Sequence, residues 1–270
     1  MIDNIGNYLS KFPQDAHYNR LREYLQWLML KALDEQGLRK QIAFVGGTAL
    51  RIIYQINRFS EDLDFSLIEP GPFDIATIAK ALEKAMRRLG LEPKISRLKN
   101  QQEKSVASFF MQFNDLLYPL GISPNKNQPL SIKFEVDANP PAGAGITDYF
   151  FADPIMFWIT HHDLPSLFSG KLSAFLFRDY DKGRDFYDLI FFLKKRSPIN
   201  LTMFQNAARQ ARMKKPYASQ KHIFDDVLAK LEKVDMSKIK NDMQPFFLDP
   251  SEEKYLSKEA ILNLLNQQGF

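Results

Sequence analysis

Cysteine is absent from this 270-residue sequence, which excludes disulfide bridges and thiolate metal sites. Glycine is scarce, at 12 residues. Gly143-Ala144-Gly145 is too short for a dinucleotide-binding fingerprint, which needs a strand before it and a helix after it. Histidine occurs only four times, without the spacing of a metal-binding pair: His17, His161, His162 and His222. These histidines are interpreted as structural or surface residues.

Long apolar runs are also missing. The richest run, YFFADPIMFWIT, is interrupted by Asp153-Pro154 and falls short of the roughly 18 residues that indicate a membrane-spanning helix. The N-terminus, MIDNIGNYLSKF, lacks the basic and then apolar pattern of a signal peptide. The lack of cysteine agrees with a reducing compartment. The sequence therefore predicts a soluble, cytoplasmic protein without a membrane partner.

The charge is mildly basic, with a formal net charge of +4, which permits a polyanionic partner without demanding one. The excess lies in the second half of the chain. Lys171–Arg196 and Arg209–Lys240 together hold sixteen Lys or Arg against eight Asp or Glu. A solvated basic face and an RNA-binding surface both explain this excess, and the RNA interpretation places Lys214 and Lys215 on the surface that binds phosphate.

The central stretch Ile42–Ser66, IAFVGGTALRIIYQINRFSEDLDFS, predicts a strand, a glycine turn, a helix, a loop and a second strand. The glycines let the backbone approach a ligand, and the start of the helix at Thr48 suits an anion. No Gly-Lys-Ser/Thr sequence follows, so this is not a Walker loop. Asp62 and Asp64 share one face of the second strand. They are either solvated acids at a polar strand end or, in the preferred interpretation, ligands of Mg²⁺ or Mn²⁺ holding triphosphate oxygens.

A third carboxylate is expected on the strand Ser131–Asp137, because its charged residues alternate with apolar ones. Lys133, Glu135 and Asp137 share one face, and charges on a strand face are costly to bury without partners. Glu135 is the preferred third ligand, and Asp137 is the competing choice. An exposed edge strand would also tolerate this pattern.

The rest of the chain predicts an α/β (α+β) fold with an N-terminal mixed sheet and flanking helices, followed by a C-terminal helical domain. The loop Asn139–Gly145 marks the expected boundary between domains at 1–150 and 151–270. Expected N-terminal elements are helices at 15–36 and 73–89 and strands at 93–99 and 105–114. From Asp153 onward the pattern is nearly all helical, with helices at 167–177, 181–195, 201–212, 219–234, 237–243 and 257–267.

Two blocks of the sequence carry a family resemblance. Gly46-Gly47-Thr48 followed by Asp62-x-Asp64 resembles the signature of the DNA polymerase β-like nucleotidyltransferases, and GGTALR…RFSEDLDF is similar to the AbiEii/AbiGii toxin family. The stretch LPSLFSGKLSAFLFRDYDKGRDFYDL, from Leu164 to Leu189, resembles that family's third and fourth motifs. The blocks also match the family in order and spacing.

The resemblance implies a metal-dependent nucleotidyltransferase that moves a nucleoside monophosphate from a triphosphate to an acceptor hydroxyl and releases pyrophosphate. The implied catalytic residues are Asp62, Asp64, Glu135 and Lys171, of which the three acids hold metal. Lys171 would neutralise the triphosphate. The implied nucleotide-binding residues are Gly46, Gly47, Thr48, Arg58, Ser60, Lys171, Arg178, Asp185 and Asp188. The nucleotide is expected in a cleft between the two domains.

Several of these residues have simpler explanations. Arg58 could pair with Glu61 instead of a phosphate, and Ser60 could make a local turn hydrogen bond. Asp185 and Asp188 could orient Lys171 and Arg178 by ion pairs. Trp27 and Trp158 are interpreted as core or domain-interface residues, and Arg184 is a candidate for phosphate or RNA.

Three functions follow from these patterns. The first is a toxin of a toxin–antitoxin or phage-defence system that adds nucleotides to tRNA 3′ ends and has a cognate antitoxin encoded alongside. The second is a nucleotidyltransferase acting on a small molecule or a protein side chain. The third is a nucleotide-binding interaction protein without turnover. The intact Asp62, Asp64 and Lys171 argue against the third, and the basic excess favours the first over the second.

Overall fold

The computed structural model describes residues 1–69, 71, 73–100 and 105–268, and these form two compact units. The sheet unit comprises Met1–Ile53, Phe59–Asn139 and Thr147–His161. The helical unit comprises Tyr54–Arg58, Pro140–Ile146 and His162–Phe270. The short segment Tyr54–Arg58 thus belongs to the helical unit although it lies within the central motif. The predicted division into 1–150 and 151–270 stays a prediction.

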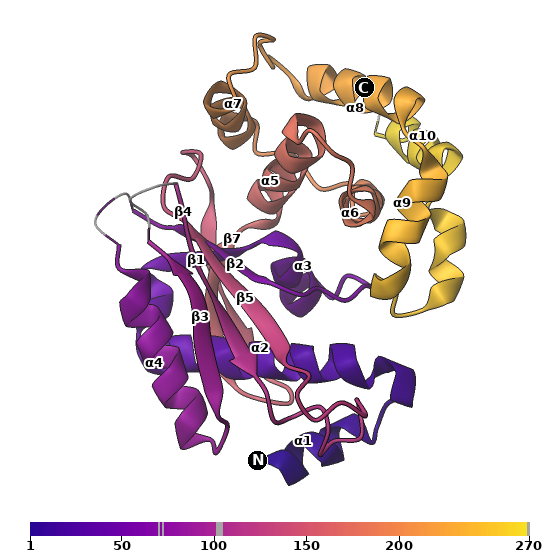
Figure 1. Cartoon of the computed structure of the whole chain (residues 1–270). Helices are drawn as coiled ribbons and strands as arrows, with labels where there is room; N and C mark the ends of the chain where they lie inside the picture. Colours follow the sequence, from indigo (N-terminus) through magenta and orange to yellow (C-terminus); the bar gives the residue numbers. More distant parts are fainter. Residues whose placement is uncertain (70, 72, 101–104, 269–270) are drawn as a thin grey trace. The chain divides into compact units, whose positions relative to one another are not determined.

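The sheet in the described part of the chain has seven strands in the order β3-β4-β5-β2-β1-β7-β6 (Figure 1). The strands are β1 Ile42–Val45, β2 Leu63–Leu67, β3 Pro93–Lys99, β4 Val106–Phe113, β5 Leu130–Asp137, β6 Ile146–Phe151 and β7 Phe157–His162. β2 runs parallel to β5 and antiparallel to β1, and β1 runs parallel to β7. The sheet is therefore mixed, and the predicted α/β fold class is confirmed.

The centre of the sheet unit is an aromatic core built on β5. Its residues alternate between buried and half-buried, as a strand with one covered face requires. Phe134 stacks between Phe65 and Phe109, with ring centroids 4.7 Å and 4.9 Å away. All three rings are nearly inaccessible to solvent, and each contributes about 1.5–3 kcal/mol by burial. The opposite face of β5 is left for Lys133, Glu135 and Asp137.

Four helices complete the sheet unit: α1 Ile2–Leu9, α2 His17–Glu35, α3 Gly46–Tyr54 and α4 Ile75–Arg88. α2 and α4 pack against each other, α2 also contacts β5, and α4 contacts β3 and β4. Asp74 caps α4 by accepting a hydrogen bond from the backbone N–H of Ala76. α2 and α4 therefore cover apolar surface that these strands present.

The helical unit contains α5 Leu164–Phe177, α6 Gly183–Lys194, α7 Leu201–Gln210, α8 Gln220–Lys233, α9 Met236–Met243 and α10 Lys258–Asn266. α5 contacts α6, α7 and α8, and Phe168 of α5 stacks on Phe192 of α6 with centroids 4.4 Å apart. At Gly183 a Cβ would lie 2.4 Å from the Ile239 carbonyl, so glycine allows α6 to approach α9. None of the described helices is long and apolar enough to cross a membrane.

The structure corrects the predicted secondary structure in the second half of the chain. A nearly helical pattern was expected from Asp153, but Phe157–His162 forms β7, which lies between β1 and β6 in the sheet. A short apolar run bounded by turn residues fits a buried strand or a helix equally well, and here the strand formed. Trp158 on β7 is 45% exposed, so it is not a core residue. The expected helices after it lie within three residues of their observed bounds.

Three smaller corrections concern the N-terminal half. α1 was not predicted. α3 begins at Gly46 rather than at Thr48, so both glycines lie in its first turn. β2 begins at Leu63, which leaves Asp62 immediately before the strand rather than within it.

Candidate active site

The central motif places a carboxylate of β2 opposite a carboxylate of the neighbouring strand β5. Asp64 on β2 is the Cα partner of Glu135 on β5, whereas Asp137 is the partner of Ser66. Partners on neighbouring parallel strands lie about 4.8 Å apart and project from the same face of the sheet. Both Asp64 and Asp62 are half-buried. The structure therefore brings Glu135, rather than Asp137, beside Asp64.

Gly46 brings the start of α3 against the Asp64 carboxylate. Val45, the last residue of β1, is the Cα partner of Asp64, so the chain turns into α3 directly beside that side chain. The φ angle of Gly46 is +77°, and a Cβ added there would lie 2.4 Å from Asp64 Oδ2. Only glycine tolerates both conditions. The positive end of the helix dipole therefore lies next to a carboxylate.

Thr48 and Ser60 organise the segment that precedes Asp62. The Thr48 hydroxyl is fully buried, donates to the Asp62 carbonyl, and shares a 2.8 Å hydrogen bond with the Ser60 hydroxyl. From α2, Gln26 donates to the carbonyls of Ser60 and Glu61, at 3.2 Å and 2.9 Å. The Thr48 hydroxyl, predicted to contact phosphate, is thus used to fix the backbone at Asp62. Ser60 makes this hydrogen bond with a residue twelve positions earlier, so it is not the local turn hydrogen bond that was its alternative explanation.

The charge on β5 is partly balanced by a neighbouring lysine. Lys133 Nζ lies 2.7 Å from Glu135 Oε1, and both side chains are about a third exposed or less. Burial raises the pKa of Asp137, although a hydrogen bond from the Asn139 backbone N–H opposes this shift. The strand register with Asp64 is therefore what distinguishes Glu135 from Asp137 as a ligand.

The donor atoms fit a hard divalent cation. Carboxylate oxygens are the ligands that Mg²⁺ and Mn²⁺ take in proteins, and Asp64 and Glu135 supply them from adjacent register positions. Within the described ranges, no three acidic or histidine side chains are gathered as a metal cluster. A cation ligated by Asp62, Asp64 and Glu135 would share the Glu135 carboxylate with its ion-pair partner Lys133.

The motif residues of the helical unit form a separate ion cluster. Arg58 donates from Nε and Nη2 to both carboxylate oxygens of Asp188, at 2.6 Å and 2.7 Å, and both side chains are almost completely buried. Lys171 Nζ lies 2.7 Å from Asp188 and 3.7 Å from Asp185. Arg178 pairs with Asp185 at 2.6 Å. Arg58 thus pairs with Asp188, and Glu61 pairs with Arg22.

The ion cluster holds three cations against two carboxylates, so its formal charge is positive. Burial by itself would raise the pKa of Asp188, but Arg58 and Lys171 outweigh burial and hold that pKa below its usual range. The Lys171 and Arg178 side chains are 17% and 29% exposed, whereas Arg58 and Asp188 are hidden. The positive charge is therefore presented to solvent by Lys171 and Arg178.

The predicted site residues fall into two groups. The sheet unit holds Gly46, Gly47, Thr48, Ser60, Asp62, Asp64 and Glu135, and the helical unit holds Arg58, Lys171, Arg178, Asp185 and Asp188. Arg184 stands apart, with its guanidinium 4.2 Å from the centroid of the Phe246 ring.

Two residues of the site were not predicted. Lys133 is the ion-pair partner of Glu135, and its place two residues earlier on the same strand face was the available signal. Gln26 fixes the backbone before Asp62 from a helix far away in sequence, where no pattern marks it.

Comparison with known proteins identifies a family. The family described as nucleotidyl transferase AbiEii toxin, type IV TA system, matches residues 27–258. MenT4, a nucleotidyltransferase toxin from Mycobacterium tuberculosis H37Rv, has a similar structure, with a TM-score of 0.56, 16% identity and 99% of each chain covered. A protein from H. pylori, for which nucleotidyltransferase activity has been suggested, has a TM-score of 0.52 and 18% identity, with 92% of this chain and 94% of that chain covered. At these identities the likeness shows a shared fold. A comparison with curated proteins found no match.

Proposed function

The chain belongs to the AbiEii family of nucleotidyltransferase toxins of type IV toxin–antitoxin systems, and from this premise we propose its reaction, its ligands and its acceptor. The motif resemblance is thereby confirmed. In the proposed reaction an acceptor hydroxyl attacks the α-phosphorus of a nucleoside triphosphate. A new oxygen–phosphorus bond forms, the bond between the α-phosphorus and the bridging oxygen breaks, pyrophosphate leaves, and the acceptor proton passes to solvent. The observation that carries the proposal is the Asp64–Glu135 register against the first turn of α3.

Asp62, Asp64 and Glu135 would hold Mg²⁺ or Mn²⁺ in this reaction. The bound metal would supply a lowered pKa for the acceptor hydroxyl and charge neutralisation for the triphosphate. The chain's own contribution is to place the oxygens. The strand register aligns Asp64 with Glu135, and the buried Thr48 hydroxyl holds the Asp62 carbonyl. The backbone N–H groups of Gly46 and Gly47 would bind the β- and γ-phosphates at the helix N-terminus.

Lys171 would neutralise the charge that grows on pyrophosphate as it leaves, because its partly exposed side chain belongs to a positively charged cluster. Asp188 positions Lys171 at 2.7 Å, and the buried Arg58 in turn holds Asp188. Arg178 would add a second positive charge, held by Asp185. Arg58, Asp185 and Asp188 then act as positioning residues rather than as direct ligands of the nucleotide.

The proposed acceptor is RNA, at the 3′ end of tRNA, in the cytoplasm, with a cognate antitoxin as the partner expected of the family. The support is electrostatic. Sixteen basic against eight acidic residues lie in 171–196 and 209–240 of the helical unit. A polyanion gains affinity from such a surface by releasing counterions, whereas a small acceptor gains little.

The test is nucleotide incorporation into RNA. The protein is incubated with Mg²⁺, total RNA and each radiolabelled nucleoside triphosphate in turn, and labelled RNA is separated by size. We expect incorporation at tRNA length from the wild type and from the matched control Asp148→Asn, which removes an exposed carboxylate paired with Arg39. Asp64→Asn should abolish it. Label entering protein or a small molecule instead of RNA would reject the proposed acceptor, and full activity in Asp64→Asn would reject the site.

A further inference from the structure

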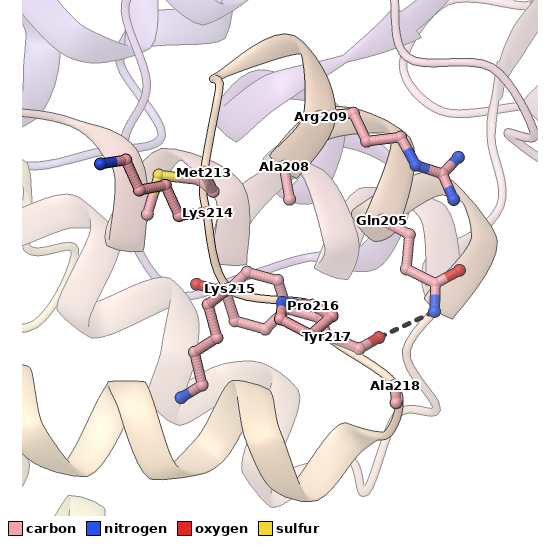
Figure 2. A pocket seen from close by; sticks show the side chains of 9 residues that line it. All are labelled: Gln205, Ala208, Arg209, Met213, Lys214, Lys215, Pro216, Tyr217 and Ala218. Carbon is pink, nitrogen blue, oxygen red and sulfur yellow. Dashed lines mark hydrogen bonds between the residues drawn. The ribbon is translucent and has the colours of Figure 1, made fainter.

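A cavity of about 380 Å³ lies in the helical unit between the end of α7 and the start of α8 (Figure 2). Its lining combines two kinds of side chain. Met213, Pro216 and Tyr217 supply apolar surface. The charged members of the lining are Arg209, Lys214 and Lys215. The cavity shares no residue with the ion cluster around Lys171, so it is a separate candidate site.

The cavity is preformed, because contacts within the protein hold Tyr217 at its base. Tyr217 is only 3% exposed, donates its hydroxyl hydrogen to Asp226 at 2.7 Å, and packs edge-on against Phe204 with centroids 5.0 Å apart. Its carbonyl accepts a 2.7 Å hydrogen bond from Gln205 (Figure 2). α7 ends in a tight turn in which the Met213 N–H donates to the Ala208 carbonyl. A preformed cavity costs little conformational entropy on binding.

Much of the positive charge around the cavity is not neutralised by carboxylates. Lys215 pairs with Asp226 at 2.5 Å. Arg209 donates to the neutral amide of Asn206, and Lys214 is exposed. Among the residues that the structure describes, neither Arg209 nor Lys214 forms an ion pair with a carboxylate. The cavity therefore attracts anions through at least two available cations.

The directions of these cations indicate the kind of anion. Figure 2 shows the charged ends of Arg209, Lys214 and Lys215 pointing away from one another, on different sides of the lining. They do not converge on one phosphate group, as a mononucleotide site requires. Spread cations around a partly apolar cavity fit a chain of phosphates with an unstacked base between them.

We propose that this cavity is a binding site for single-stranded RNA, in which one base enters against Met213 and Pro216 while flanking phosphates contact Arg209 and Lys214. The assignment rests on the proposed function in one respect, that RNA is the acceptor. The new element is a second contact between the protein and the acceptor strand, at a distance from the reacting end of that strand. Reversing Lys215 would set a new carboxylate against Asp226, so Arg209 and Lys214 are the cleaner positions to change.

The test is direct binding of a fluorescent single-stranded RNA of mixed sequence, without triphosphate, over a series of salt concentrations. The double variant Arg209→Gln/Lys214→Gln is compared with Lys11→Gln/Lys94→Gln, which removes two exposed lysine charges from the sheet unit. Loss of two phosphate contacts should make the slope of log affinity against log salt shallower by about 1.4, since each contact contributes about 0.7 for single strands. The control should keep the wild-type slope.

A second variant tests the apolar lining of the cavity separately from its charges. Met213 is 40% exposed, so Met213→Ala leaves the fold intact. It should weaken RNA binding several-fold with an unchanged salt slope, because only an apolar contact is lost. Affinity equal to wild type in Met213→Ala would reject the proposed binding of a base in the cavity. A double variant that binds RNA like its control would reject the site.

The two proposals fail in different ways. RNA binding that depends on Arg209 and Lys214, without nucleotide incorporation into RNA, would reject the proposed acceptor and keep the cavity site. Incorporation into RNA together with wild-type binding by the double variant would reject the cavity site and keep RNA as the acceptor. Fluorescent polyglutamate serves as the competing ligand. Its binding in place of RNA, with loss in the double variant, would indicate an acidic protein partner and overturn the RNA site.

Discussion

Replacing Gly46 with alanine should damage transfer far more than stability. The backbone there has φ +77°, which costs an L-residue about 1–2 kcal/mol. The new Cβ would lie 2.4 Å from Asp64 Oδ2, where ordinary contact begins at 3.4 Å, so the carboxylate must move by about 1 Å. A misplacement of that size in a reacting site costs about 100-fold in rate. We therefore expect about a 100-fold lower rate of nucleotide transfer.

Gly37→Ala is the matched control. Gly37 has φ +68°, and a Cβ there would meet nothing within 4 Å, so this variant reproduces the backbone strain without the clash. Both variants should lose about 2–8 °C in melting temperature, the range expected for 1–2 kcal/mol in a chain of this size. Thermal unfolding and pyrophosphate release are measured on the same samples. Equal activity in the two variants would refute the account of how Asp64 is placed.

Three further predictions concern the ions of the site. Chelation should stop transfer, and Mg²⁺ or Mn²⁺ should restore it; activity that persists in chelator would exclude carboxylate-held metal. Lys171→Ala should lower kcat strongly without unfolding the protein. Lys171→Arg should recover only part of the lost kcat, because a guanidinium differs in shape from an ammonium. An unchanged kcat in Lys171→Ala would show that Lys171 takes no part in the reaction. Because its neighbours hold the pKa of Asp188 below the unfolded value of about 3.9, the stability that Asp188 contributes is present above pH 4 and is lost as pH falls through its folded pKa. Urea titrations should show a larger fall in the free energy of unfolding on acidification in wild type than in Asp188→Asn; identical pH profiles would contradict this.

The shared face of Glu135 and Asp137 was predictable because a strand has a period of two. The same alternation was expected to put Asp62 on a strand face with Asp64, but Asp62 lies immediately before β2. The choice between Glu135 and Asp137 was not predictable, since it depends on the register between strands some seventy residues apart. A slip of two residues would have set Asp137 beside Asp64 without changing any buried face.

The ion cluster shows a second limit of sequence patterns. Arg58 and Asp188 are separated by 130 positions, and nothing local to Arg58 distinguishes Asp188 from Glu61 as its partner. The pairing depends on the tertiary fold, in which Tyr54–Arg58 packs with the C-terminal helices. Asp185 and Asp188, by contrast, lie one turn apart on α6, so helical periodicity predicted that they share a face. They do meet Lys171 and Arg178, as the ion-pair alternative expected.

The most direct measurement is pyrophosphate release by Glu135→Gln and Asp137→Asn, with RNA and saturating triphosphate and with the fold of each variant verified by thermal unfolding. The two substitutions are equally conservative and lie two residues apart on one strand face. If Asp64 and Glu135 hold the metal together, Glu135→Gln should lose activity as completely as Asp64→Asn, and Asp137→Asn should keep a rate close to wild type. Full activity in Glu135→Gln, or loss confined to Asp137→Asn, would contradict the proposed site.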